Sequence, residues 1–122
     1  MSKSTTLANS QLDAEFNSTA FSITGDPEIS LHTGDHGITG TNEVAGGSYA
    51  RDATAFAAAA SKSVTNTAAA IFTNMPAAVV THVGVWSAAG VFLRGGELTA
   101  SLTVFLGGTV TLGIGEITAT EA

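Results

Sequence analysis

The side chains best suited to chemistry gather in one short stretch, where His32, Asp35 and His36 stand beside a glycine-rich segment. Imidazole and carboxylate groups are common ligands of transition metals, so three of them this close together raise a metal site as one interpretation. The alternative is a polar loop in which Asp35 and Gly37 serve turn geometry. Because no third histidine is near in sequence, we favour the polar loop.

Acidic residues flank Pro27, where Asp26 and Glu28 supply carboxylate oxygens of the kind that calcium prefers. Their spacing fits no calcium-binding loop, so we expect no calcium site there.

Signals for catalysis are weak elsewhere in the chain. A Ser–His–Asp triad is defined by geometry, but no G-x-S-x-G motif marks a nucleophile. His82 lies within an apolar strand pattern, which is typical of a histidine that donates to a backbone carbonyl. Trp86 fits a core or a subunit contact, although Tyr49 and Trp86 together are the aromatic platform that a glycan-binding protein would need. We therefore expect that the protein is not an enzyme and holds no metal or other cofactor.

Composition predicts one folded domain whose surface is covered in part by neighbours. The chain has 122 residues, of which 44% are hydrophobic, and this excludes intrinsic disorder as the overall class. Only 11% are charged, against about 25% in ordinary soluble domains. A surface so poor in charge is unusual for a free monomer, so we expect contacts with other subunits.

Net charge argues against two classes of partner. The formal charge is −6, and the four basic residues, Lys3, Arg51, Lys62 and Arg94, form no run. Nucleic-acid binding and anchoring to an anionic membrane surface both need clustered basic residues, so neither is expected. The chain has no cysteine, no secretory apolar segment near its start and no apolar run of about 18 residues that would span a membrane.

The elements that position these residues are mainly short strands. Residues 4–16 favour a short helix capped by Ser4 or Thr5, with Leu12 and Phe16 on one face; the alternative is an irregular arm anchored by these two side chains. Residues 28–33 alternate as a half-buried strand, with Ser30 and His32 on its second side. Residues 34–47 form a long glycine-rich loop, of a length typical of functional or partner-covering loops.

The remainder alternates between strands and glycine turns. We expect a strand over residues 48–56, a turn through residue 62, and a strand over residues 64–72 that ends before Met75-Pro76. Residues 79–86 are apolar on both faces and fit a central strand. Residues 91–94, 98–106, 109–114 and 116–120 complete the pattern, with a bulge at residues 95–96 and a turn at residues 107–108. The predicted fold is all-β, an antiparallel β-sandwich of jelly-roll type over residues 18–122, preceded by an arm or short helix over residues 1–17.

Three segments resemble a known family. They are ISLHTGDHGITGTNEVAGGSYARDATAF, SVTNTAAAIFTNMPAAVVTHVGVWSA and LTASLTVFLGGTVTLGIGEIT, and they look like small bacteriophage virion proteins labelled tail fibre-like, head fibre or minor capsid proteins. In that family a strand ending in LHT precedes an acidic glycine loop and a NEV-x-GG-x-YAR turn. A THVG strand ending in tryptophan, a hairpin and two LT-bearing strands follow. The likeness spans roughly residues 20–120.

The resemblance implies a virion structural protein made in the bacterial cytoplasm. We expect a capsid decoration or minor capsid protein on the capsid surface, bound to the major capsid protein and forming a homo-oligomer, with a trimer favoured. The alternative is a tail fibre or a tail-tip receptor- or glycan-binding module. A third hypothesis is a small cupin-like enzyme with a metal on the three histidines. Seven residues of the arm, the loop and the turn after it are the expected interface: Leu7, Leu12, Phe16, His36, Ile38, Tyr49 and Arg51.

Overall fold

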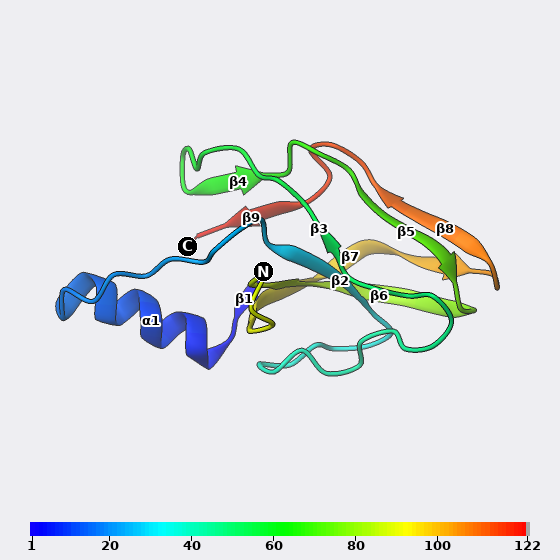
Figure 1. Ribbon diagram of the computed structural model, residues 1–122, viewed down its shortest axis with the longest axis horizontal. Coiled ribbons are helices and arrows are strands. Elements are labelled where there is room, and N and C mark those ends of the chain that lie inside the picture. Colours follow the sequence, from blue (N-terminus) through cyan, green and yellow to red (C-terminus); the bar gives the residue numbers. More distant parts are fainter. Residues whose placement is uncertain (122) are drawn as a thin grey trace.

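The structure, a computed structural model that describes residues 1–121, consists of antiparallel strands and one helix (Figure 1). The all-β prediction is confirmed, whereas the jelly-roll connectivity and the division at residue 17 stay predictions. In chain order the elements are β1 (Ser2–Lys3), α1 (Thr5–Phe16), β2 (Glu28–His32), β3 (Asp52–Ala53), β4 (Ser63–Thr65), β5 (Ala70–Met75), β6 (Ala78–Trp86), β7 (Phe92–Val104), β8 (Gly108–Leu112) and β9 (Thr118–Thr120).

Helix α1 begins as the sequence predicts. The Ser4 side chain accepts a hydrogen bond from the Leu7 N–H at 3.1 Å, which satisfies one free donor of the first turn. The Ser4 N–H donates to the carbonyl of Leu93 at 2.6 Å, so the start of the helix is tied to β7. Leu7 is buried in the core, while Leu12 and Phe16 point outward with exposed fractions of 53% and 76%. The helix therefore projects from the domain (Figure 1).

The main sheet has five strands in the order β1-β7-β6-β2-β3. Strand β6 lies at its centre, as predicted, and pairs with β2 from Glu28 opposite Trp86 to His32 opposite His82. Strand β1, which the sequence pattern does not indicate, pairs with β7. The sheet is thus held at one edge by the residues just before α1.

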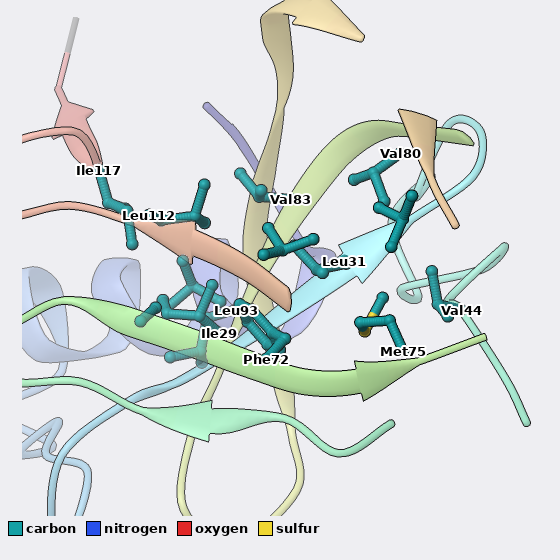
Figure 2. Packing of buried hydrophobic residues seen from close by; sticks show 14 of the residues in the cluster. Ile29, Leu31, Val44, Phe72, Met75, Val80, Val83, Leu93, Leu112 and Ile117 are labelled. Atoms are coloured by element: carbon teal, nitrogen blue, oxygen red, sulfur yellow. The ribbon is translucent and has the colours of Figure 1, made fainter. Parts of the chain in front are cut away.

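Two smaller pairs, β5–β8 and β4–β9, lie over one face of the main sheet. The apolar core fills the space between them (Figure 2). It includes Ile29 and Leu31 from β2, Val80 from β6, Phe72 from β5 and Leu112 from β8. Each two-stranded pair would be marginal by itself, so its stability comes from packing onto the sheet.

Strand β2 departs from the predicted half-buried pattern, because Ser30 and His32 are buried as well as Ile29 and Leu31. The glycine-rich loop explains the difference. Residues 42–44 pair beside β2 through the Val44 N–H to the Leu31 carbonyl at 2.9 Å, and the loop then covers the second face of the sheet.

The strand predicted over residues 48–56 is reduced to β3. The backbone at Tyr49 forms a turn, in which the Tyr49 N–H donates to the Gly46 carbonyl. The side chains of Tyr49 and Arg51 both bond to Glu43. The strand predicted over residues 64–72 is divided into β4 and β5. Asn66, buried between them, bonds to the distant segment 113–117 and forces the chain to bend there.

The hairpin arm over residues 91–94 and the strand over residues 98–106 are a single long strand, β7. The expected bulge at residues 95–96 is wrong, because Gly95 and Gly96 pair regularly with Gly84 and Val83. The register changes instead on either side of them. A Cβ atom on Gly95 would lie 2.6 Å from the His36 ring, so this glycine makes room for a side chain and does not bend the strand.

Candidate functional site

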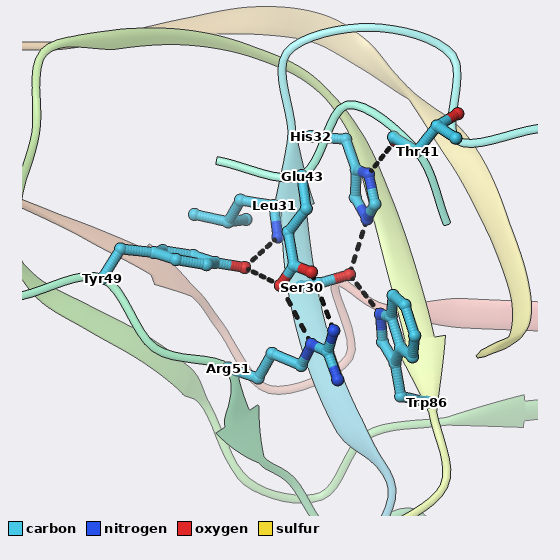
Figure 3. A network of polar contacts seen from close by, with 8 residues as sticks. All are labelled: Ser30, Leu31, His32, Thr41, Glu43, Tyr49, Arg51 and Trp86. Carbon is cyan, nitrogen blue, oxygen red and sulfur yellow. Dashed lines mark hydrogen bonds and ion pairs between the residues drawn. The ribbon is translucent and has the colours of Figure 1, made fainter. Parts of the chain in front are cut away.

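The most organised polar region lies beneath the glycine-rich loop and centres on Glu43 (Figure 3). Arg51 donates to the Glu43 carboxylate through two nitrogens, Nε to Oε2 at 2.9 Å and Nη2 to Oε1 at 2.8 Å. The Tyr49 hydroxyl donates to the same Oε2 at 2.8 Å and accepts from the Leu31 N–H at 3.0 Å. One carboxylate thus joins the loop, the turn after it and strand β2.

Burial and neighbouring polar groups together set the pKa of the Glu43 carboxyl. Partial burial raises the pKa of Glu43, but the hydrogen bonds from Arg51 and Tyr49 outweigh it and hold that pKa below its usual value. Burial also raises the pKa of the Tyr49 hydroxyl, which therefore stays protonated and donates. The Glu43–Arg51 pair is consequently ionised at neutral pH, and both carboxylate oxygens of Glu43 accept hydrogen bonds.

A second chain of bonds starts at Trp86. The Arg51 guanidinium lies 3.5 Å from the Trp86 ring centre, and the Trp86 Nε1–H donates to Ser30 Oγ at 2.8 Å. Ser30 Oγ is 2.7 Å from His32 Nε2, and His32 Nδ1 is 2.7 Å from the Thr41 carbonyl. A carbonyl only accepts, so we assign the proton of His32 to Nδ1, with Nε2 accepting from Ser30. Burial lowers the pKa of His32, in agreement with a neutral ring.

Two glycines make space for this network. A Cβ atom on Gly84 would lie 2.5 Å from Ser30 Oγ, and one on Gly40 would lie 2.5 Å from the Trp86 ring. Gly40 also has a φ of +79°, which favours glycine on conformational grounds. The network therefore depends on residues without side chains as much as on polar ones.

Asp35 serves turn geometry, as the alternative interpretation of the sequence predicts. Its Oδ1 accepts from the Gly37 N–H at 2.8 Å, and this bond lowers the pKa of the Asp35 carboxyl. Its carbonyl accepts from the Asn42 side chain at 2.8 Å. The loop is thus closed by its own hydrogen bonds.

The three histidines come together, although His82 is far from His32 and His36 in sequence. The His36 ring centre lies 6.2 Å from that of His32 and 5.8 Å from that of His82. Both ring nitrogens of His32 are occupied, and Nδ1 of His36 lies 2.7 Å from the Gly37 carbonyl. Among residues 1–121, no three His, Asp or Glu side chains are arranged to hold a metal ion.

The expected interface residues fall into three groups. Leu7 and His36 are buried within the chain, and Tyr49 and Arg51 are partly buried in the network. Leu12, Phe16 and Ile38 are exposed and free to touch a neighbour. A role of these residues in binding a partner stays a prediction.

Tyr49 and Trp86 do not form the exposed aromatic platform that the glycan-binding alternative would need. Trp86 is buried with Arg51 stacked on its ring, while Tyr49 stacks on Phe72 with ring centres 6.1 Å apart. The sequence reasoning also missed Glu43 and Ser30. Glu43 could have been found from its position, because it is the nearest acidic residue before Tyr49 and Arg51, the two side chains that bond to it.

Comparison with protein-family models gives a match to most of the chain. A family model described as Podophage GP4 fiber I protein gp80 matches residues 2–120. No curated protein matches the chain. No helix in the described part of the chain has the length and apolar character needed to cross a bilayer.

Proposed function

The chain belongs to the Podophage GP4 fiber I protein gp80 family, a family of phage virion structural proteins, and from this membership we propose that it is a subunit of a fibre on the phage tail. The match over residues 2–120 is the single observation that carries the proposal. It favours the fibre alternative over the capsid decoration protein that we expected first.

The architecture supports a mechanical role without catalysis. Hydrogen bonds within the chain occupy the polar groups of the network, and no buried side-chain nitrogen or oxygen in residues 1–121 lacks a partner. A site preorganised for a substrate would leave polar groups free to bind it. We therefore propose that the network holds the glycine-rich loop as a rigid surface and that the protein is not an enzyme.

Exposed apolar side chains supply surface for contacts with neighbouring virion subunits. Large ones stand on the helix and in the glycine-rich loop: Leu12, Phe16 and Ile38. Burial of such residues drives most protein association. We propose a homo-oligomer, with a trimer still favoured, as the form in which the protein joins the virion.

A second candidate is a capsid decoration protein bound to the major capsid protein. The observation that favours it is the absence, within residues 1–121, of a repeated unit or a long stalk, because the one helix has only 12 residues. A single small domain without a stalk suits attachment to a shell surface.

Immunogold labelling of purified virions separates the two candidates. Gold confined to the tail supports the fibre subunit, and gold spread over the whole head favours the decoration protein instead. Particles that carry no label, with labelled free protein as the positive control, would overturn both.

A further inference from the structure

An apolar groove of about 400 Å³ opens between the main sheet and the β4–β9 pair. Its walls are formed mainly by side chains of the N-terminal segment, the core and the region of the β4–β9 pair, among them Met1, Ile23, Phe56, Val64, Val85 and Ile117. This volume is within the range of sites that bind small ligands or protruding side chains.

Basic residues gather at this groove, although the chain as a whole is acidic. Lys62 and Arg94 line it, and Lys3 lies beside it through its ion pair with Glu121. Three of the four basic residues of a chain with net charge −6 therefore surround one opening. Glu121, which also bonds to Arg94, is the one acidic side chain that lines the groove within residues 1–121. The rim keeps an excess of positive charge.

The end of α1 carries exposed apolar side chains and an acidic one. Leu12 and Phe16 stand four residues apart, and Glu15 stands three after Leu12, so the three side chains share one helix face. That face points away from the domain, because Leu7 takes the core side. The Glu15 side chain is exposed. An exposed apolar pair with an adjacent acid is the complement of an apolar groove with a basic rim.

We propose that the end of α1, residues 12–16, docks in this groove of a second copy of the chain. The helix cannot turn into its own groove, because the Ser4 N–H fixes its start to the Leu93 carbonyl. Helix α1 lies at one end of the molecule, and β4 and β9 lie on the side of the molecule nearer to it (Figure 1). Each copy can therefore place its helix end in the groove of the next copy, and this head-to-tail contact closes a ring in a symmetric homo-oligomer such as a trimer. The contact rests on the homo-oligomer of the proposed function and is independent of where the protein sits in the virion.

Sedimentation of the purified full chain over a range of concentrations tests the contact. We expect the unmodified protein to self-associate and Phe16→Ser to weaken association about tenfold or more, since exposed aromatic anchors dominate interfaces. Phe105→Ser is the matched control, because Phe105 is 78% exposed and Phe16 is 76% exposed. It should leave association unchanged. Thermal melting confirms that both variants stay folded.

A charge exchange tests the orientation of the helix in the groove. Glu15→Lys and Lys62→Glu should each weaken association, and the two changes together should restore it. A monomeric unmodified protein would overturn the proposal, as would equal loss of association in the Phe16 and Phe105 variants. Failure of the exchange to restore association would overturn the pairing of Glu15 with Lys62. None of these results alters where gold labels the virion, so failure of this contact is distinct from failure of the fibre assignment.

Discussion

Replacing Tyr49 by phenylalanine removes a single oxygen that serves two partners. In the native chain that oxygen donates to Glu43 at 2.8 Å and accepts from the Leu31 N–H at 3.0 Å. The ring itself stacks on Phe72, and Tyr49→Phe keeps that packing. The substitution therefore isolates the polar contribution of the hydroxyl.

The expected loss of stability depends on which partner of the Tyr49 hydroxyl is left without a hydrogen bond. Glu43 keeps both bonds from Arg51, but the Leu31 N–H lies on a fully buried residue and loses its acceptor. An unsatisfied buried donor costs about 1–3 kcal/mol, so we expect a loss of about 2 kcal/mol in the free energy of unfolding. With an unfolding entropy of about 2.1 cal/mol/K per residue over 122 residues, this lowers the Tm by about 8 °C.

Urea unfolding and calorimetry of Tyr49→Phe measure this loss directly. Thr67→Val is a suitable control, because it also removes one hydroxyl hydrogen bond, to the Ala55 carbonyl, but at an exposed position. The control should change the free energy of unfolding by less than about 0.5 kcal/mol. If Tyr49→Phe costs no more than the control, the hydroxyl does not hold the loop to the sheet and the reasoning is refuted.

Three further predictions concern the same framework. Asn66→Ala should cost about 3 kcal/mol, because the buried side chain makes four hydrogen bonds to backbone groups; urea unfolding measures it. Gly40→Ala should destabilise far more than Gly46→Ala, since both have positive φ but only Gly40 would bring a Cβ atom within 2.5 Å of the tryptophan ring. The free energy of unfolding should fall as pH is lowered from 7, because folding depresses the pKa values of both His32 and Glu43. The decline begins below 6.5, where His32 becomes protonated in the unfolded chain, and continues below 4.5, where Glu43 does. Urea unfolding at several pH values measures the decline.

Contrary outcomes are equally definite. Equal destabilisation by Gly40→Ala and Gly46→Ala would mean that contact with the Trp86 ring does not limit the residue at position 40. A stability that rises on acidification from pH 7 to pH 5 would mean that the buried histidine is protonated in the folded chain. A cost below about 1 kcal/mol for Asn66→Ala would mean that water replaces its bonds.

Local signals in the sequence predict a large part of the fold. The residue type of Ser4 predicts the helix cap, and the spacing of four between Leu12 and Phe16 predicts that they share one helix face, but the spacing does not predict that this face points outward. The central position of β6 follows from its apolar character on both faces, and Pro76 ends the preceding strand as a residue without an N–H must.

The site was less predictable because its contacts join distant parts of the chain. Trp86 and Ser30 bond across 56 positions, and Asn66 bonds to residues about 50 positions away. Alternation in β2 places Ser30 and His32 on a second face but cannot reveal that the glycine-rich loop covers it. Gly84 illustrates the difficulty, since in sequence it marks a weak point of a strand and in the structure it makes room for Ser30.

The copy number of the protein in purified virions distinguishes a fibre subunit from a capsid protein. Quantitative mass spectrometry, with the major capsid protein as the internal reference, gives that ratio without labelling or mutation. A fibre subunit predicts a small copy number, a minor fraction of the capsid protein. A copy number that approaches that of the capsid protein would contradict the fibre assignment, and absence from the particle would contradict a virion role altogether.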